Sequence, residues 1–372
     1  MSRSVGSTVT VLALLLGCPG LFADEARRPI YQAQVINQPG HYVLTRDLQV
    51  AQLPAISIQT DGVTVDLNGH TISSTATTGD VVAIAPPNPC QDAGVRIQNG
   101  RIRGGGVGIH LQPPNPCALR LLDLEVGGAA VQGILVEQAG PTEIRRAQIG
   151  GGTAPALQIL FPAGSREAFT LSDLQLTGGC AGIQVVAGHG TISDSHITQT
   201  PPNPCLHPAL DLQDVSGGLV QGNTIQISAD TACTVVGMQA LRSEAIQIRD
   251  NVIQVSSSQF ASRYGIFLDA QSQDAQIVGN TVAGFCTAGI RVLSNHNRIA
   301  ENMVNRNQFS GMQIGGENNL VEGNRMAGNG QYGIQFLNAQ GPHIYRSNIL
   351  RGNTQGAVGG TAGNTDAGGN VQ

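Results

Sequence analysis

The sequence has no lysine and no tryptophan, and aromatic residues make up only 3% and charged residues 12% of its 372 residues. All 20 basic residues are therefore arginines, and the formal net charge is -5. Nucleic-acid binding needs a basic stripe that displaces counterions from phosphates, and the sequence shows none, so we expect no nucleic-acid partner. So few charges beside 49 glycines also exclude a helical protein and a charged disordered tail. This composition is typical of many short strands joined by tight turns.

The sequence also lacks an apolar run long enough to cross a bilayer as a helix. Residues 1–23 carry one arginine before an apolar run from Val9 to Leu16, which is the architecture of a secretory signal, with cleavage expected after Ala23. The tetrapeptide LLGC, ending at Cys18, also resembles a bacterial lipobox, so a lipid anchor at Cys18 is the alternative. Both routes predict an exported protein, periplasmic or extracellular, that is not transmembrane.

A repeat of 22 to 24 residues fills the stretch from Gln273 to Gly352. Each copy has a short apolar run, an Asn, a Gly-rich turn and a second alternating strand that opens with Gly. A period in this range indicates a solenoid, in which each unit contacts only its neighbours. Leucine-rich repeats share the period, but they need Leu at fixed places and a helical or 3₁₀ return segment, and these units have neither. The pattern therefore predicts an all-β fold, a single-stranded solenoid of the parallel β-helix type.

Units of this kind can be laid out from Asp61 onward, and they predict a β-helix of about twelve rungs over residues 61–358. Residues 27–60 also alternate apolar and polar residues, with Pro39-Gly40 as a turn signal. We expect them to form N-terminal capping strands that block edge-to-edge pairing of the first rung. Residues 359–372 are expected to form a C-terminal tail.

Several phrases carry a family resemblance. PGHYVLTRDL, GVTVDLNGHTI, the recurrent GN-T-[IV] pattern and the ending RGNTQGAVGGTAGNTDAGGN resemble the secreted bacterial right-handed parallel β-helix repeat proteins, which belong to the pectin-lyase-like superfamily. The resemblance covers nearly all of the chain after the signal and implies a right-handed helix. It implies little about activity, because the superfamily includes lyases, glycosidases, epimerases, adhesins and members with no assigned activity.

Stacked rungs place equivalent side chains about 4.8 Å apart, so repeated residues form rows. One row at a turn predicts a ladder of hydrogen-bonded amides: Asn223, Asn251, Asn280, Asn302, Asn324 and Asn348. A second row, on the outward side of the Gly-led strands, is rich in Gln: Gln158, Gln184, Asp211, Gln239, Phe267, Arg291, Gln313 and Gln335. We interpret this second row either as a neutral hydrogen-bonded surface or as a shallow groove that binds sugar hydroxyls.

Six cysteines remain after the signal, an even number that predicts disulfides in an exported protein. Cys90 and Cys117 both end the phrase PPNPC, one rung apart, and are predicted to be bonded to each other. The other four precede Gly-led strands. They are expected to pair as Cys180–Cys205 and Cys233–Cys286, with Cys205–Cys233 as the competing pairing. The chain has neither a CxxC motif nor a clustered set of histidines, so we expect no metal, and no cofactor is expected either.

Known catalytic motifs of this fold are incomplete in the sequence. Gly188-His189-Gly190 resembles the GHG of polygalacturonase-type glycosidases, but Gly178-Gly179 stands where that family has the paired acids that inverting hydrolysis requires. The phrase from Arg263 to Asp269 is similar to the YGxDPH region of alginate epimerases but lacks its Pro-His. Four histidines in different units are interpreted as isolated surface residues: His70, His110, His196 and His296.

The best remaining catalytic constellation is Asp211, Asp269 and Arg291. The two carboxylates are expected two rungs apart on the outward face, about 10 Å. Since lysine is absent, a β-elimination would need Arg, His or Tyr as its base. Further substrate contacts are expected from these residues: Gln184, Gln239, Arg242, Tyr264 and Gln313.

Two functions stay open at this point. One is an exported, non-catalytic protein whose outer face binds carbohydrate, as a polysaccharide or as part of a cell-envelope surface. The other is a polysaccharide-active enzyme, a lyase, glycoside hydrolase or epimerase, with a groove on the outer sheet near rungs six to nine. The scarcity of aromatic residues, 3% of the chain, argues against a deep groove in which sugars stack on rings.

Overall fold

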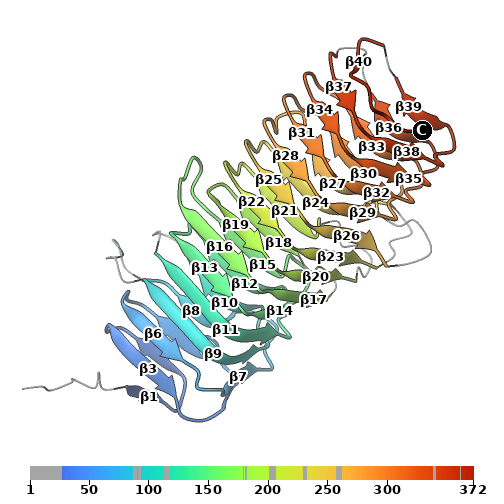
Figure 1. The fold of residues 1–372 in the computed structure, drawn as a ribbon. Helices are drawn as coiled ribbons and strands as arrows, with labels where there is room; N and C mark the ends of the chain where they lie inside the picture. Colours follow the sequence, from blue (N-terminus) through green and yellow to red (C-terminus); the bar gives the residue numbers. More distant parts are fainter. Residues whose placement is uncertain are drawn as a thin grey trace, which may run out of the picture.

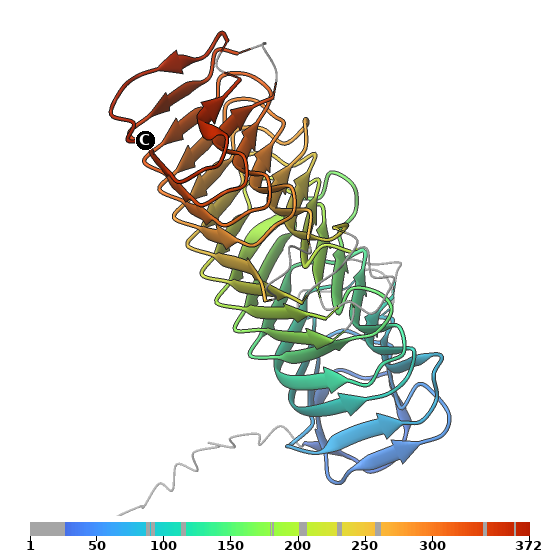
Figure 2. The ribbon, with the colours of Figure 1, turned by 90° about the vertical axis from the view of Figure 1, so that its right-hand side faces the viewer.

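The computed structural model describes residues 27–86, 90, 94–112, 117–178, 180, 182–200, 207–228, 233–256, 262–337, 341–360 and 362–372. The predicted signal segment, cleavage site and Cys18 lie outside these residues. The chain winds as a right-handed parallel β-helix whose rungs stack along one axis, from β1 (Arg28–Ile30) to β40 (Thr365–Asp366), as Figures 1 and 2 show from two sides. The part of the chain that the structure describes contains no helix with the length and hydrophobicity needed to span a bilayer.

Each rung contributes a strand to three parallel ladders. The first ladder is a sheet of 14 strands. Its members are β2 (Gln34–Ile36), β5 (Ile56–Ile58), β8 (Asp80–Ile84), β10 (Val107–Leu111), β12 (Gln132–Glu137), β15 (Leu157–Leu160), β18 (Ile183–Val186), β21 (Leu210–Gln213), β24 (Val236–Leu241), β27 (Tyr264–Leu268), β30 (Ala288–Val292), β33 (Ser310–Ile314), β36 (Tyr332–Phe336) and β39 (Gly356–Gly359).

The other two ladders form one sheet of 26 strands. The second ladder contains β1, β3 (Gly40–Leu44), β6 (Val63–Asp66), β9 (Val95–Arg103), β11 (Leu119–Gly127), β13 (Thr142–Arg145), β16 (Ala168–Ser172), β19 (His189–Ser193), β22 (Leu219–Gln221), β25 (Gln247–Arg249), β28 (Gln276–Val278), β31 (Arg298–Ala300), β34 (Leu320–Glu322), β37 (Ile344–Arg346) and β40. The third contains β4 (Leu48–Val50), β7 (Thr71–Ser74), β14 (Gln148–Gly151), β17 (Gln175–Gly178), β20 (His196–Gln199), β23 (Thr224–Ile227), β26 (Val252–Val255), β29 (Thr281–Ala283), β32 (Met303–Asn305), β35 (Arg325–Ala327) and β38 (Ile349–Arg351).

The bend between the second and third ladders is made by one residue in the left-handed region. Gly279 and Asp250 occupy this position with φ of 72° and 54°, a conformation that Gly, Asn and Asp tolerate best. In β9 and β11 the same bend falls inside a single strand, at Asn99 and Asp123, with φ of 60° and 56°. These two nine-residue strands belong to both ladders and therefore join them into one sheet.

The 14-stranded ladder contains two strands more than the predicted twelve rungs. The additional strands, β2 and β5, come from residues 27–60 and pair in parallel register with the strands that follow them. At the other end, β40 pairs with β37, and Val371 bridges Ile349. Strands before and after both predicted boundaries, residues 60 and 358, thus belong to the same sheets. The division into cap, β-helix and tail, and the capping role of residues 27–60, stay predictions.

Inward-facing aliphatic side chains form one continuous core along the whole solenoid. In-register pairing stacks Ile97 on Leu121 and Leu121 on Ile144, and all three are buried. Burying each such side chain contributes about 1.5–3 kcal/mol. Because the core has the same composition at every level, length can be added without a new folding unit.

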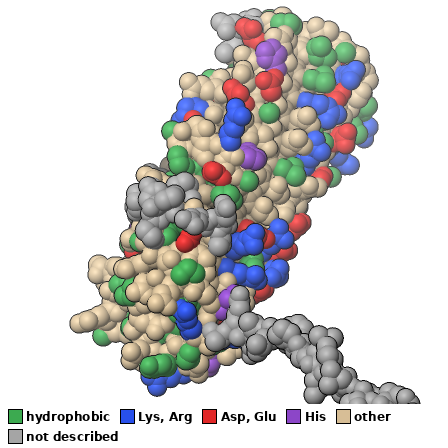
Figure 3. All heavy atoms as spheres, turned by 90° about the vertical axis from the view of Figure 1, so that its left-hand side faces the viewer, with side chains coloured by type: hydrophobic (Ala, Val, Ile, Leu, Met, Phe, Trp, Pro, Cys, Tyr) green, Lys and Arg blue, Asp and Glu red, His purple; other side chains and the backbone are tan. Residues whose placement is uncertain are grey.

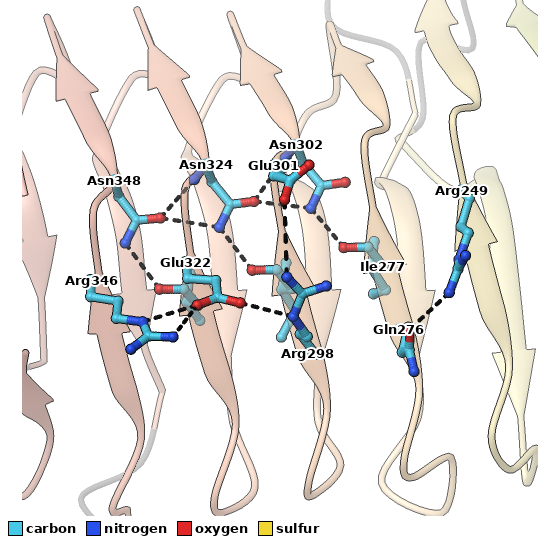
Figure 4. A network of polar contacts seen from close by, with 12 residues as sticks. Arg249, Gln276, Ile277, Arg298, Glu301, Asn302, Glu322, Asn324, Arg346 and Asn348 are labelled. Atoms are coloured by element: carbon cyan, nitrogen blue, oxygen red, sulfur yellow. Dashed lines mark hydrogen bonds and ion pairs between the residues drawn. The ribbon is translucent and has the colours of Figure 1, made fainter.

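The predicted Asn ladder is present and buried. From Asn251 onward, each Asn side-chain oxygen accepts hydrogen bonds from both the backbone N–H and the amide nitrogen of the Asn one rung earlier, as between Asn280 and Asn302 at 2.9 and 3.0 Å. Each amide also donates to a backbone carbonyl, as Asn302 does to Ile277 at 2.9 Å (Figure 4). The ladder runs through Asn223, Asn251, Asn280, Asn302, Asn324 and Asn348 to Asn370.

Two further ladders were not predicted, although their members are spaced by 22 or 24 residues as well. One joins Asn297 to Asn319, and the other joins Asn307, Asn329 and Asn353. The C-terminal rungs are therefore held by amide rows at three turns. Buried backbone groups that the turns would leave unpaired find their partners in these rows.

Disulfides lie at the predicted turns. Cys90 is bonded to Cys117 with a Cα–Cα distance of 5.5 Å, and Cys233 is bonded to Cys286 with 6.1 Å, so both predictions are confirmed. The competing pairing of Cys205 with Cys233 is therefore wrong. Cys180 is also disulfide-bonded, and Cys205 lies outside the described residues.

Replacing Asn302 with Ala should destabilise the solenoid. The substitution leaves the buried backbone N–H of Asn280 without its acceptor, which costs about 1–3 kcal/mol. We expect a lower urea midpoint than in the wild-type protein. The matched control is Met303→Ala, because Met303 follows Asn302 directly and is 42% exposed. Equal losses from the two substitutions would contradict a stabilising role for the ladder.

His343 takes the place of an Asn in the ladder that joins Asn297 to Asn319. It is fully buried, stacks on Phe336 with centroids 5.2 Å apart, and its Nδ1 accepts a hydrogen bond from the backbone N–H of Asn319 at 3.3 Å. Its Nε2 has no hydrogen-bond partner within the residues described. Burial lowers the pKa of His343 below its usual 6.5, and the more distant Glu317 only partly offsets this.

The lowered pKa makes the C-terminal rungs sensitive to acid. Below pH 6.5 the unfolded chain binds a proton that folded His343 does not, so the stability present above this pH decreases as the pH falls. The substitution His343→Asn restores an amide at the ladder position. We expect its urea midpoint to fall less than that of the wild-type protein between pH 7 and pH 5. The same fall in both proteins would show that His343 is not responsible.

Candidate functional site

The outward row predicted on the Gly-led strands lies on the 14-stranded sheet. Backbone register pairs its members one to the next over eight rungs, without a gap. In order they are Gln158, Gln184, Asp211, Gln239, Phe267, Arg291, Gln313 and Gln335. These side chains therefore form one polar line parallel to the solenoid axis.

The N-terminal part of this row is a directed chain of hydrogen bonds that ends at Asp211. The Gln132 amide donates to Gln158 at 3.2 Å, Gln158 donates to Gln184 at 2.5 Å, and Gln184 donates to Asp211 at 2.8 Å. From the other side, Gln239 donates to the second oxygen of the Asp211 carboxylate at 2.8 Å. A carboxylate can end the chain because it only accepts hydrogen bonds, whereas each amide both accepts and donates.

Asp211 is consequently a structural acceptor in this arrangement. Its side chain is only 3% exposed, and a third amide, that of Gln213, donates to it at 2.7 Å. Both carboxylate oxygens are engaged by amide N–H groups, so neither faces an open space as a general base must. Removal of any one of the donors would leave a buried carboxylate less well compensated.

Asp269 lies away from the row. Leu268 pairs with Ala240, and Phe267 pairs with Gln239, so the residue two rungs from Asp211 is Phe267. Asp269 follows the end of β27, and its Oδ1 accepts from the hydroxyl of Ser272 at 2.6 Å and from the backbone N–H of Arg242 at 3.1 Å. Asp269 lies two residues beyond Phe267, the residue whose side chain occupies the row at this rung. The expected pair of facing carboxylates is therefore not formed.

Arg291 belongs to an aromatic cluster instead. Its Nη1 donates to the hydroxyl of Tyr264, and its guanidinium lies 5.1 Å from the centroid of the Tyr264 ring. Arg263 is also 5.1 Å from this ring, and Tyr264 stacks on Phe267 with centroids 5.4 Å apart. Arg242 is not part of the cluster, since it forms a two-pronged ion pair with Asp214 at 2.7 and 2.8 Å.

The C-terminal part of the row retains hydrogen-bonding capacity. The Gln313 amide donates to Gln335 at 3.1 Å, and the hydroxyl of Ser310 donates to the same oxygen at 3.0 Å. Gln313 Oε1 and Arg291 Nε, on paired residues of adjacent rungs, are buried and have no hydrogen-bond partner within the described part of the chain. One is an acceptor and the other a donor, a combination that a hydroxyl group can satisfy.

One cluster on this face was missed by the sequence analysis. His110, predicted to be an isolated surface residue, is only 15% exposed in its side chain and lies between two carboxylates. Its Nδ1 is 3.0 Å from Asp80 Oδ2, and its Nε2 is 3.0 Å from Glu137 Oε2. Gln112 donates to the same Asp80 oxygen at 2.7 Å. The prediction was wrong because Asp80 and Glu137 reach His110 diagonally from opposite ends of the neighbouring strands β8 and β12.

The environment of His110 favours its protonated form. Burial by itself lowers the pKa, but hydrogen bonds to Asp80 and Glu137 outweigh it and raise the pKa of His110 above its usual 6.5. With both ring nitrogens facing carboxylates, only the imidazolium can donate to both. The stabilisation is therefore fully present below pH 6.5 and is lost as the pH rises through the raised pKa.

A titration of the imidazole signals by NMR would test this cluster. We expect the pKa of His110, assigned with the variant His110→Gln, to lie above 6.5. Glu137→Gln should lower it by removing one charged acceptor. A His110 pKa at or below 6.5 would contradict the arrangement.

The described residues contain no group of three or more His, Cys, Asp or Glu side chains that could hold a metal ion. The GHG sequence lies on another face, because His189 begins β19 of the second ladder and its side chain is exposed. Neither feature adds to the row on the 14-stranded sheet.

Comparisons with known proteins agree with this architecture. A family model described as a right-handed beta helix region matches residues 264–365, while a comparison with curated proteins finds no match. The A-module of the Azotobacter vinelandii mannuronan C-5 epimerase AlgE6 is similar in structure, with 14% sequence identity, a TM-score of 0.50 and coverage of 90% of this chain and 88% of that one. The chain has the pectin-lyase-like, right-handed parallel β-helix fold.

Two further solved structures are more distant from this β-helix. The periplasmic alginate epimerase AlgG has 14% identity and a TM-score of 0.41, with 79% of this chain and 61% of that chain covered. Tailspike protein 3 of bacteriophage CBA120 has 10% identity and a TM-score of 0.42, with 92% of this chain and 56% of that chain covered. Neither likeness bears on the activity of this chain, which depends on its own side chains.

Proposed function

We propose that this β-helix protein is exported and binds polysaccharide along the outer face of its 14-stranded sheet. The observation that carries the proposal is the unbroken outward row from Gln158 to Gln335. Its members lie about 4.8 Å apart, and five of the eight side chains are Gln amides. Each Gln in the hydrogen-bonded chain donates one N–H to a neighbour, and its amide nitrogen carries a second. Such a line suits a linear chain of hydroxyl-bearing units.

The aromatic cluster supplies a second element that sugars use. Phe267 is half-buried beside Tyr264, and a partly exposed ring can pack against the apolar face of a sugar. Near Phe267, Arg291 Nε is a buried donor and Gln313 Oε1 a buried acceptor, and neither has a partner in the described residues. A small shift of the guanidinium would let a sugar hydroxyl pair with both. We therefore place the centre of the binding face at β27, β30 and β33.

Export is supported by the disulfides, which persist in oxidising compartments. A polysaccharide ligand also has a precedent on this fold, because the similar Azotobacter vinelandii module is named for its action on mannuronan. Periplasmic or extracellular location and lipid anchoring at Cys18 remain alternatives within the proposal.

Catalysis is the second candidate. The trio of Asp211, Asp269 and Arg291 lacks the mutual contacts that a joint role would need, as their separate partners show. The specific observation in favour of an enzyme is His110 between Asp80 and Glu137, an acid–base group on the same face. On this alternative the substrate would be a polysaccharide and the reaction a lyase, hydrolase or epimerase step.

Binding to a panel of acidic and neutral polysaccharides, measured by affinity electrophoresis and calorimetry, tests the proposal. We expect at least one ligand to bind, and Phe267→Ala to weaken it by about tenfold, the value of one aromatic contact. Gln335→Ala should weaken it less. The matched control is Gln254→Ala, an amide on β26 of the third ladder, which should leave binding unchanged.

Failure to bind any polysaccharide, or equal binding by Phe267→Ala and the control, would contradict the proposed face. The same incubations distinguish the two candidate functions. New reducing ends or absorbance from unsaturated sugars would establish the enzyme, and loss of that activity in His110→Gln would assign it to the His110 cluster.

A further inference from the structure

A hollow lies on a different face of the solenoid from the outward row, over β3, β6, β9 and β11 of the second ladder. It has a volume of about 440 Å³. Its polar lining comes from one outward row in which backbone register pairs His41 with Thr64, Thr64 with Arg96, and Arg96 with Arg120. Small residues, including Gly62 and Ala118, line the hollow at the starts of the strands.

The two charged residues that line this hollow, Arg96 and Arg120, are both positive. Arg96 and Arg120 lie on adjacent rungs, about 4.8 Å apart along the axis, and like charges opposite each other on neighbouring strands repel. No acidic residue is among those that line the hollow. Arg120 reaches Glu143 only at 3.4 Å, and Glu143 is shared with Arg145 at 2.9 Å.

Arg96 has no ion pair or side-chain hydrogen bond within the residues that the structure describes. Arg96 contributes only weakly to the lowered pKa of Asp123, which is due chiefly to a hydrogen bond from Arg146. Strands β9 and β11 and residues 142–146 together carry six arginines against three acidic residues, a surplus of three positive charges. Figure 3 shows arginines gathered with fewer acidic side chains on the N-terminal half of one face.

We propose that this hollow binds the anionic groups of an acidic saccharide. The planar guanidinium forms paired hydrogen bonds with a carboxylate or a sulfate ester, and two guanidiniums one rung apart can hold a single such group or two successive ones. The hydroxyl of Thr64 and the ring of His41 extend the row, which spans about 14 Å over four rungs. A simple oxyanion would contact only Arg96 and Arg120, whereas a saccharide would extend along the whole row as far as His41. The volume is within the range of small-ligand pockets.

This hollow is independent of the proposed polysaccharide-binding face, because it lies on the second ladder and shares no residue with the row from Gln158 to Gln335. Its ligand class follows from charge, while the other face is argued from amides and an aromatic ring. A saccharide polymer that is acidic could therefore contact the protein at two faces.

Calorimetry with a galacturonate trisaccharide, its uncharged methyl ester and inorganic phosphate tests the inference. We expect the acid to bind in low salt at least tenfold more tightly than the ester and than phosphate. Arg96→Gln should weaken binding of the acid by about tenfold. This substitution breaks no ion pair of the described chain, so folding should be unaffected, as checked by thermal unfolding.

Arg120→Gln should have a comparable effect on binding. The matched control is Arg325→Gln, which removes an exposed charge from β35 on the third ladder and should bind like the wild-type protein. Affinity that is lowered by Phe267→Ala and unchanged by Arg96→Gln would instead assign the saccharide to the proposed polysaccharide-binding face. Absence of binding, equal affinity for the ester, equal affinity for phosphate, or unchanged affinity in Arg96→Gln would each overturn the inference.

Discussion

In-register stacking of parallel strands is the constraint on which the rest of this structure depends. Every residue has the equivalent residue of the next rung about 4.8 Å away on either side. Such a neighbour is favourable for Ile and Val in the core, which pack on their own kind, and for Asn, whose amide is both donor and acceptor. It is unfavourable for a charge, whose equivalent neighbour would repel it. The abundance of uncharged side chains follows from this geometry.

The charged residues that remain show how repulsion is avoided. Glu322 lies between Arg298 and Arg346 of the rungs on either side, at 2.8 and 2.7 Å, and the two guanidiniums hold the pKa of Glu322 below its usual value (Figure 4). Glu125 is shared by Arg101 and Arg103, which both lie on the neighbouring strand β9. Opposite charges thus alternate or converge within a row, and the adjacent Arg96 and Arg120 depart from this pattern.

Much of the fold could be predicted because the repeat itself encodes it. The spacing of Asn280, Asn302 and Asn324 fixes which side chains stack, and the ladder and the outward Gln row both follow from that spacing. The PPNPC phrases likewise placed Cys90 beside Cys117. The prediction of about twelve rungs after residue 60 agrees with the twelve strands from β8 to β39 in the 14-stranded sheet. The other two strands of this sheet, β2 and β5, come from residues 27–60 and pair in the same register.

The candidate site was less predictable because its contacts run diagonally. A repeat alignment compares equivalent positions, and it cannot show that Asp80 and Glu137 reach His110 from different positions on neighbouring strands. It also cannot show that Asp211 gathers amides from three strands, or that Asp269 lies beyond the end of β27. Asp269 lies two residues after Phe267, the residue that occupies the row at this rung.

The main Asn ladder has a direction. From Asn223 to Asn348 every amide donates one N–H to the Asn of the next rung toward the C-terminus, so the amide dipoles align head to tail up to Asn370. The positive end of this row falls at Asn370, where Asp366 accepts its amide at 2.6 Å and also accepts the backbone N–H of Gly368. An acidic residue at this position opposes the dipole as one does at the N-terminus of an α-helix. The last amide of the main ladder, that of Asn370, is therefore bonded to Asp366 of its own turn. It is less available to a stacked Asn of another chain that would extend the ladder.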